Sequence, residues 1–411
     1  MSLQDTPRGE RVHIALFGRR NAGKSSLINA LTGQQISIVS DVAGTTTDPV
    51  FKAMELLPIG PVVMIDTPGL DDEGALGLLR IERARAVLEK TDAAIVAADS
   101  QNEIGDFERE ILAQIKERKI PAILVLNKSD LSGTADSLPA YALSLQKELS
   151  VPVVIASGVT GQGIEDLKQT LIRILPEEED KFQLVGDLLS PSDIVVLVVP
   201  IDKAAPKGRL ILPQQQTIRD ILEADAMVIV TKEYELRDTL SALSRKPRMV
   251  ITDSQVFAKV SADTPRDIQL TSFSILFARY KGDLPVMVRG ARTIDTLEDG
   301  DKILIAEGCT HHRQCDDIGT VKLPRWIRQH TGKSIECVFT SGGTYPADLT
   351  PFSMIVHCGA CMLNRREMHY RIRSAEKAGI PISNYGVLIA HMQGILPRVL
   401  EPFPLAAMEA E

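Results

Sequence analysis

The segment Gly18–Ser25 near the start of the chain could bind the phosphates of a nucleotide. It reads Gly-Arg-Arg-Asn-Ala-Gly-Lys-Ser and matches the phosphate-loop pattern G-x-x-x-x-G-K-[ST] at every required position. In such a loop, backbone N–H groups and the N-terminus of the following helix surround phosphate oxygens. Lys24 would reach the β and γ phosphates, and Ser25 would be a ligand of Mg²⁺. A chance glycine-rich turn is the alternative, and the motifs that follow argue against it.

Two further motifs extend this site and select the base. Asp66-Thr67-Pro68-Gly69 would hold Mg²⁺ through water and contact the γ-phosphate with the Gly69 N–H group. Asn127-Lys128-Ser129-Asp130 follows a later predicted strand, and the Asp130 carboxylate can accept two N–H bonds from the Watson–Crick edge of guanine. Adenine does not offer that pair of donors, so the motif predicts GTP rather than ATP as the ligand.

Two shorter segments complete the predicted site. Ser157-Gly158 resembles a guanine-binding Ser-Ala pair, with a glycine that keeps the backbone N–H contact. Gly44-Thr45-Thr46-Thr47-Asp48 lies where a first switch segment is expected. The residues predicted to bind the nucleotide are Asn21, Ala22, Gly23, Lys24, Ser25, Ser26, Asp66, Gly69, Asn127, Lys128, Asp130, Ser157 and Gly158.

Together these motifs resemble the GTPases of the TrmE–Era group, whose first switch reads Gly-Thr-Thr-Arg-Asp. The resemblance implies that Thr46 is a second ligand of Mg²⁺ and that Asn21 binds K⁺, with Thr47 in place of the arginine of that group. Leu70 stands where Ras-type enzymes place a glutamine that orients water, so we expect slow GTP hydrolysis stimulated by potassium. The residues expected to act in catalysis are Lys24, Thr46 and Gly69.

A second group of residues could bind a metal. All five cysteines and six of the seven histidines lie in the last third of the chain. Cys358-Gly359-Ala360-Cys361 places two thiolates on one tight turn, and Cys309-Thr310-His311 adds a third thiolate. Thiolates suit either zinc or an iron–sulfur cluster, and the spacing leaves both open. Three thiolates are one short of the usual four of a cubane cluster, which would leave one iron with an exchangeable ligand.

Other polar residues of this region are expected to have structural roles. Cys337 lies in a strand-like run and is expected in the core, and Cys315 is a rival metal ligand. The histidines expected to be isolated, at the surface or in ordinary packing, are His312, His330, His369 and His391. The arginines expected on a solvated helix face are Arg365, Arg366, Arg371 and Arg373.

The elements that must position these residues follow from hydrophobic periodicity. From Val12 to Leu175, short apolar strands alternate with amphipathic helices, which predicts a parallel sheet with helices on both faces. The acidic run 177–180 marks a domain boundary. A small, three-stranded α/β block follows, and residues 261–272 look like a linker. The predicted domains are residues 1–176, 182–262 and 265–411. The predicted strands are Val12–Phe17, Val62–Ile65, Ala93–Ala97, Ala122–Leu126, Val153–Ile155, Ile194–Val199, Met227–Val230, Met249–Ile251, Lys302–Ala306 and Ile335–Phe339.

Length and composition limit the class of protein. A chain of 411 residues suggests two or three domains of roughly 150 residues each. The net charge of -8 and the 4% aromatic residues argue against broad nucleic-acid binding. The strongest apolar run, Ile194–Ile201, is far too short to cross a membrane, and the polar N-terminus has no signal-peptide pattern. We therefore expect a cytoplasmic protein.

The combination of motifs resembles the GTPases that mature di-iron (FeFe) hydrogenases, over nearly the whole chain. The specific part is the pattern Cys309-x-His311 with His357-Cys358-x-x-Cys361 joined to this type of GTPase. The fold implied is α/β: a P-loop GTPase with a parallel sheet, a small α/β dimerisation domain and a C-terminal α/β iron–sulfur domain.

The resemblance also implies a role. Cys309, Cys358 and Cys361 would bind a 4Fe-4S cluster, with His311 and His357 as nearby candidate ligands. A homodimer would receive the di-iron subcluster precursor from radical-SAM maturases and deliver it to apo FeFe-hydrogenase. GTP hydrolysis would regulate the exchange of partners.

Two other functions remain open on the sequence. One is an RNA-associated GTPase with a zinc-binding C-terminal domain, which the acidic balance and the lack of an RNA-binding module disfavour. The other is a redox or structural metal protein that senses GTP without turnover. A membrane iron transporter with a GTPase domain is excluded by the lack of apolar spans.

Overall fold

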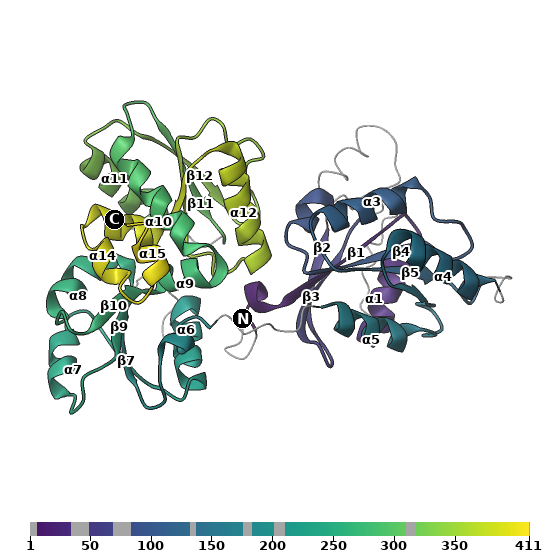
Figure 1. Cartoon of the computed structure of the whole chain (residues 1–411), viewed down its shortest axis with the longest axis horizontal. Coiled ribbons are helices and arrows are strands. Elements are labelled where there is room, and N and C mark those ends of the chain that lie inside the picture. The colour runs from purple at the N-terminus through teal and green to yellow at the C-terminus, as the bar shows by residue number, and fades with distance from the viewer. Residues whose placement is uncertain are drawn as a thin grey trace. The chain divides into compact units, whose positions relative to one another are not determined.

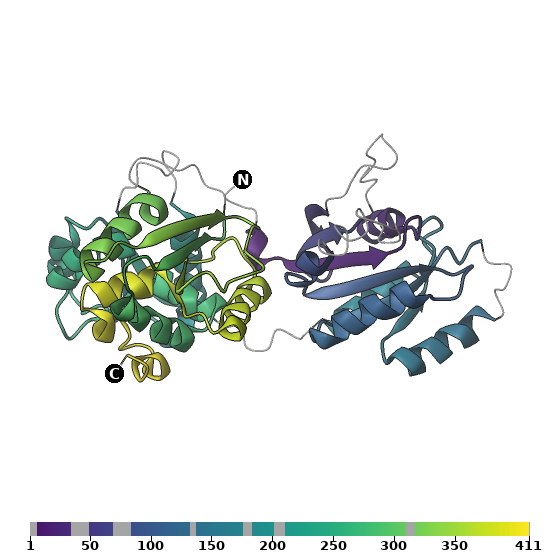
Figure 2. The ribbon, with the colours of Figure 1, turned by 90° about the horizontal axis from the view of Figure 1, so that it is seen from above.

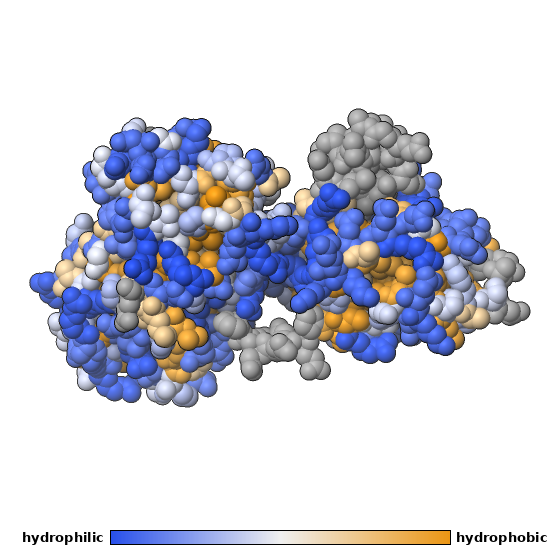
Figure 3. Space-filling model, turned by 45° about the horizontal axis from the view of Figure 1, so that its top comes forward, coloured by the Kyte–Doolittle hydropathy of each residue, from blue (hydrophilic) through white to orange (hydrophobic). Residues whose placement is uncertain are grey.

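The chain forms two compact units, Met1–Glu179 and Asp180–Glu411, in a computed structural model. The structure describes residues 6–33, 49–68, 84–131, 137–175, 183–200, 210–309 and 317–410. In these ranges no helix is both long enough and apolar enough to cross a bilayer. The face of the molecule seen in Figure 3 is mostly hydrophilic, with apolar residues in small scattered patches.

The first unit is built on a six-stranded sheet with the order β2-β3-β1-β4-β5-β6 (Figure 1). All neighbouring strands are parallel except β2 and β3, which are antiparallel. Strands β1, β4 and β5 are almost entirely buried and mostly apolar, as expected for a parallel sheet covered by helices on both faces. The strands are β1 (Val12–Gly18), β2 (Val50–Leu56), β3 (Gly60–Asp66), β4 (Ala93–Asp99), β5 (Ala122–Asn127) and β6 (Val153–Ile155).

Two hydrophobic cores hold helices against the two faces of this sheet. One core includes Ile111 and Ile115 of α3 and Leu145 of α4, and the other includes Leu27 of α1 and Leu167 of α5. The helices are therefore on both sides, as the strand–helix alternation predicts (Figure 1). The described helices are α1 (Lys24–Thr32), α3 (Asp106–Glu117), α4 (Leu138–Leu149) and α5 (Ile164–Ile174), with the short 3-10 helix η1 (Arg8–Glu10) before β1.

The second unit contains two four-stranded parallel sheets, β10-β9-β7-β8 and β12-β11-β13-β14. One continuous hydrophobic core joins them, so the two sheets belong to the same compact body. The strands are β7 (Ile194–Val198), β8 (Met227–Thr231), β9 (Met249–Thr252), β10 (Gln269–Ser272), β11 (Lys302–Glu307), β12 (Glu336–Ser341), β13 (Met354–His357) and β14 (Ile382–Asn384).

Helices lie on both sides of these sheets, and polar side chains fix where several of them begin (Figure 2). Ser272, Asn364 and Asn384 each accept a hydrogen bond from a backbone N–H in the first turn of the helix that follows. The helices are α6 (Leu212–Glu223), α7 (Leu236–Ala242), α8 (Phe257–Asp263), α9 (Phe273–Lys281), α10 (Leu284–Arg292), α11 (Leu323–Thr331), α12 (Arg365–Ala378), α13 (Tyr385–Met392), α14 (Leu396–Val399) and α15 (Pro404–Ala407). Single turns are η2 (Gly186–Leu188), η3 (Ser254–Val256), η4 (Thr293–Thr296) and η5 (Ile318–Lys322).

The structure corrects the expected linker and adds a strand to the middle sheet. Residues 261–272 are not a linker, because they include the end of α8 and strand β10, which pairs with β9. The middle block therefore has four strands rather than three. The polar sequence of β10, Gln-Leu-Thr-Ser, hides it from a search for apolar runs.

Candidate nucleotide and metal sites

The predicted phosphate loop lies between the end of β1 and the start of α1, as the motif requires. Gly23 immediately precedes the helix with a φ of 83°, and a Cβ atom there would lie 2.2 Å from the Asn127 side-chain nitrogen. Asn21 also has a positive φ, of 64°, and its side chain is exposed at the rim of the loop. The sequence thus supplies residues that tolerate this backbone where the loop must turn.

Two buried side chains brace the loop. The Lys24 ammonium donates hydrogen bonds of 2.9 Å to the carbonyl oxygens of both Gly18 and Arg19. The Asn127 amide, at the end of β5, donates to the Ala22 carbonyl at 2.8 Å. These contacts place a cation and a fixed backbone turn at the N-terminus of α1, where anions bind favourably.

A hydroxyl and a carboxylate meet where Mg²⁺ is expected. The Ser25 hydroxyl donates to Asp66 Oδ2 at 2.9 Å. Burial raises the pKa of Asp66, although Lys24, Ser25 and Lys52 act to lower it. Its second oxygen, Oδ1, is buried and has no hydrogen-bond partner among the described residues. An oxygen in that state fits a hydrated divalent cation, which would supply the missing partner.

The base-recognition segments come together at the ends of β5 and β6. The Asn127 side-chain oxygen accepts a hydrogen bond of 3.0 Å from the Gly158 N–H group, and the Lys128 ammonium lies 2.7 Å from Asp99 Oδ2. Ser157 is buried, and its hydroxyl accepts from the Thr160 N–H group at 3.1 Å. The Asp130 carboxylate is exposed, so it is accessible to a base.

The packing around Gly158 explains why glycine replaces the alanine of the Ser-Ala pair here. A Cβ atom at this position would lie 2.8 Å from the Ser26 carbonyl carbon and 2.9 Å from the Leu27 nitrogen, both in the backbone of α1. Only glycine therefore lets this loop pack so closely on the helix that carries Ser25 and Ser26.

Several predicted site residues lie outside the described residues. They are Thr46 and Gly69 of the expected catalytic set, the rest of the switch segment 44–48, Leu70, and His311, His312 and Cys315 of the last third of the chain.

The three predicted cysteine ligands follow two adjacent strands. Cys309 comes just after β11, and Cys358–Cys361 comes just after β13. Strands β11 and β13 are parallel neighbours, with Ala306 opposite His357 in the register. Because the carboxyl ends of neighbouring parallel strands meet at one edge, the three cysteines lie at the same edge of this sheet.

Backbone donors point at the sulfur of Cys358. The Gly308 N–H group lies 3.1 Å from Cys358 Sγ, and the Ala360 N–H group lies 3.4 Å from it. Ala360 has a φ of 55°, so the turn between the two cysteines is a tight one that aims its N–H group inward. Hydrogen bonds of this kind stabilise thiolate charge and tune the potential of iron–sulfur clusters.

Burial and neighbouring charges raise the pKa of these thiols. The pKa of Cys309 is raised to about 12, mainly by burial and also by the charges of Cys358, Cys361, Glu307 and Asp317. The pKa of Cys361 is also raised to about 12, mainly by burial and also by Cys358. Without a metal the thiols are therefore protonated at neutral pH, and binding a metal must release protons.

A buried lysine, which the sequence does not single out, fixes the loop that carries Cys361. Lys281, at the end of α9, is 1% exposed. Its ammonium donates to the Cys361 carbonyl at 3.1 Å and to the Leu363 carbonyl at 2.7 Å. The positive charge of Lys281 also lowers the pKa of the Cys361 thiol, so it favours the thiolate form of that residue.

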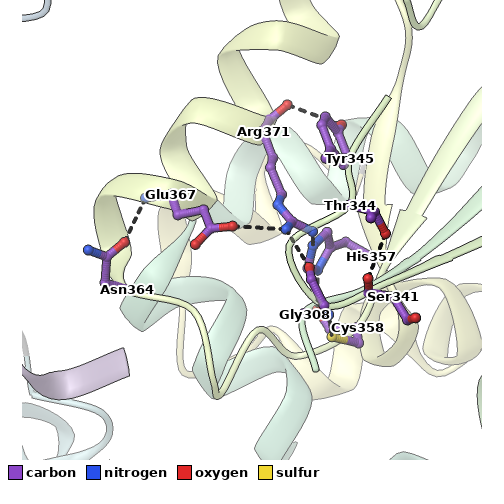
Figure 4. Close-up of polar contacts among 10 residues, drawn as sticks. Gly308, Ser341, Thr344, Tyr345, His357, Cys358, Asn364, Glu367 and Arg371 are labelled. Carbon is purple, nitrogen blue, oxygen red and sulfur yellow. Dashed lines mark hydrogen bonds and ion pairs between the residues drawn. The ribbon is translucent and has the colours of Figure 1, made fainter. Parts of the chain in front are cut away.

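His357 and Arg371 form a second buried support (Figure 4). Arg371 is not on a solvated face as expected, because it is 1% exposed and donates to His357 Nε2, to the Gly342 carbonyl and to Glu367 Oε1, each at 3.0 Å. His357 Nδ1 contacts the Cys358 carbonyl at 2.9 Å. The pKa of His357 is lowered to about 3, mainly by burial and also by the charge of Arg371, so the imidazole is neutral. Both ring nitrogens are engaged, which gives His357 the role of positioning Cys358.

The structure also places Cys337, His330 and His391, which the sequence predicts to have structural roles. Cys337 lies in β12 and packs against the core, which confirms its predicted place. His330 and His391 are not isolated, because both imidazoles contact the carboxylate of Asp295. They meet only in the folded chain, so neither is recognisable from its sequence neighbours.

Three family models match successive segments of the chain. A model described as 50S ribosome-binding GTPase matches residues 13–128. A model of the hydrogen maturase F dimerization domain matches residues 184–282, and one of the hydrogen maturase F tetramerization domain matches residues 285–402.

Individual relatives match about half of the chain or less. The chain is 34% identical to the tRNA modification GTPase MnmE of Nitrosomonas europaea over 165 residues, covering 40% of this chain and 35% of that protein. It is 32% identical to the GTPase Era of Rippkaea orientalis over 220 residues, covering 53% of this chain and 66% of that protein. A solved structure of an Era variant from Aquifex aeolicus bound to GDP·AlF4⁻ aligns with a TM-score of 0.36 at 23% identity, covering 54% of this chain and 94% of that one. The chain thus spans about a third to two thirds of the length of these curated relatives.

Proposed function

Because the chain belongs to the hydrogenase maturation GTPases of the hydrogen maturase F type, we propose that it hydrolyses GTP and serves as an iron–sulfur scaffold that carries the di-iron subcluster precursor. It would receive this cargo from radical-SAM maturases and deliver it to apo FeFe-hydrogenase. The observation that supports the scaffold role is the position of three partly buried cysteines just after the neighbouring parallel strands β11 and β13.

The nucleotide site supports the hydrolytic part of this proposal. Lys24 would neutralise phosphate charge, Ser25 and Thr46 would ligate Mg²⁺, and Asp66 would hold the ion through water. The unpartnered Oδ1 of Asp66 fits a hydrated ion at this place. Asn21, which is exposed in this loop, would bind K⁺ beside the phosphates. The bound K⁺ would supply positive charge there, whereas the apolar side chain of Leu70 cannot orient the attacking water.

The donor set of the thiol site fits a 4Fe-4S cluster. Cys309, Cys358 and Cys361 would each ligate one iron, and the fourth iron would keep an exchangeable ligand. A cluster of this kind can accept a guest there and release it, which a carrier requires. Lys281 and the N–H groups of Gly308 and Ala360 would offset the negative charge of the bound cluster.

The second unit offers features that support an oligomer. Strand β8 lies at the edge of its sheet, and Met227 and Val230 on it are exposed. An exposed apolar edge strand readily pairs with another chain. We propose that the region 182–262 forms the homodimer and that residues 265–411 carry the cluster.

Metal analysis tests the scaffold role. After anaerobic reconstitution, we expect about four irons and four sulfides per chain and an electron paramagnetic resonance signal from the reduced cluster. Cys309→Ala, Cys358→Ala and Cys361→Ala should each lose that signal. Cys337→Ala is the matched control, because Cys337 lies in β12 of the same sheet, and it should keep both iron and signal. Zinc bound in place of iron, or equal loss in the control, would refute the scaffold role.

The hydrolytic role has its own test. GTP turnover should be faster in K⁺ than in Na⁺, and Asn21→Ala should remove the difference. Equal rates of the wild type in both salts would contradict the assignment of Asn21 to K⁺. Lys24→Ala should abolish turnover in either salt.

A further inference from the structure

Three side chains outside both sites meet at one point of the second unit. Asp295 lies in η4, His330 in the last turn of α11 and His391 in the last turn of α13. His330 Nε2 is 2.8 Å from Asp295 Oδ1, and His391 Nε2 is 2.8 Å from Asp295 Oδ2. All three ligand atoms lie within 4.8 Å of one another. Residues 35 and 96 positions apart in the chain are thus brought to one carboxylate by three separate elements.

The elements that carry these residues favour a cation. The helices α11 and α13 end beside the cluster, and a helix C-terminus carries partial negative charge. The two helix ends and the carboxylate together give a negative potential at the point where the imidazole nitrogens meet.

The cluster is accessible and opens onto a hollow. The side chains of His330 and His391 are 27% and 20% exposed, so water can reach the ligand atoms. A cavity of about 260 Å³ lies directly beside His330 and is lined by Trp326, Gln329, His330, Ile389, Met392 and Gln393. A group bound in this cavity would contact His330, one of the three residues of the cluster.

We propose that Asp295, His330 and His391 form a site for a divalent transition metal, with Zn²⁺ as the best-suited ion. The ligands would be the two Nε2 atoms and one carboxylate oxygen, a nitrogen and oxygen set that zinc accepts with a fourth position left for water. Each neutral imidazole would then carry its proton on Nδ1. The site has no thiolate, so its chemistry differs from that of the cysteine site, and one of its ligands, His330, also lines the Trp326 cavity.

The single tryptophan of the chain provides a local reporter. Trp326 is one helical turn before His330 on α11 and lines the same cavity. Co²⁺, a paramagnetic substitute for Zn²⁺, should quench Trp326 fluorescence when added to the nucleotide-free full-length chain, and the quenching should saturate. Added Zn²⁺ should restore the fluorescence by displacing Co²⁺.

Substitutions can distinguish metal binding at this site from metal binding at the thiols. His330→Ala, His391→Ala and Asp295→Asn should each weaken Co²⁺ binding at least about tenfold, since loss of even an outer-shell partner costs that much. His369→Ala is the matched control, and Cys358→Ala with Cys361→Ala should also leave the quenching unchanged. Asp295→Asn keeps the shape of the side chain, so it remains informative where an alanine variant fails to fold. Absence of quenching in the wild type, or quenching lost with the cysteines and kept in His330→Ala, would overturn the proposal.

Discussion

The buried imidazole of His357 predicts a specific loss of stability in acid. Its pKa is lowered from 6.5 to about 3, first by burial and then by Arg371. A histidine whose pKa is lowered on folding contributes stability that is fully present above the unfolded value. That stability is lost as the pH falls from 6.5 toward 3, because the unfolded chain takes up a proton that the folded chain refuses.

The size of the effect follows from the two pKa values. Each unit of difference is worth about 1.4 kcal/mol, so the free energy of unfolding should fall by about 2 kcal/mol between pH 7 and pH 5 on account of this one group. In His357→Gln the titrating group is absent, and glutamine can still accept a hydrogen bond from Arg371. The stability difference between wild type and variant should therefore shrink by about 2 kcal/mol over the same interval.

The assay is urea unfolding of the metal-free full-length chain at about pH 7 and pH 5, followed by Trp326 fluorescence. Only the change of the wild-type–variant difference with pH matters, so the baseline cost of the substitution drops out. His369→Gln serves as a control, because His369 is only partly buried and the same difference should change less. A His357→Gln difference that is the same at both pH values would refute the assignment of a neutral, buried imidazole.

Three further predictions concern the packing and charge of the two sites. Gly158→Ala should destabilise the first unit by about 1–3 kcal/mol and weaken GTP binding, because the new Cβ atom meets the backbone of α1. Thermal unfolding and nucleotide titration measure the two effects, and an unchanged midpoint of thermal unfolding would contradict the prediction. Asp66→Asn should raise the stability of the nucleotide-free chain near neutral pH and abolish Mg²⁺-dependent turnover. The pKa of Asp66 is raised in the folded chain, so ionisation of this carboxyl costs stability as the pH rises from the unfolded-state pKa toward the raised one. A lower thermal stability of the variant would contradict this argument. Lys281→Met keeps the apolar stem of the side chain but removes the two hydrogen bonds from the ammonium group to the loop after Cys361. The iron retained after reconstitution should therefore fall, while GTP turnover should not change. Normal iron retention would show that the ammonium group is not needed.

Much of the nucleotide site could be predicted because its motifs are contiguous and each follows an apolar strand. The phosphate loop lies between β1 and α1, and Asn127 ends β5, as expected from those local patterns. The strands that were missed are short or polar, such as β10, or carry alternating polarity, such as β2. Their place in a sheet depends on neighbours that are distant in the sequence.

The supports of the thiol site could not be predicted for the same reason. Helix α12 has charged residues around most of its circumference, so nothing in its sequence distinguishes Arg371 from its exposed neighbours. Arg371 is buried because His357 and Gly342, from other elements, offer it acceptors. Lys281 is likewise buried only because the loop after Cys361 turns its carbonyl groups toward α9.

Strand order, rather than distance along the chain, explains why both candidate sites form. In the first unit β3 lies beside β1, so Asp66 at the end of one strand reaches the helix that follows the other and bonds to Ser25. In the second unit β13 lies beside β11, and Cys358 meets the backbone of Gly308 although 50 residues separate them. A parallel sheet joined by helical crossovers brings the carboxyl ends of its strands to one edge, where loops are free to carry chemistry. The two sites therefore use the same architectural device for different ligands, because the loops at that edge supply a cation and backbone donors in one unit and thiols in the other.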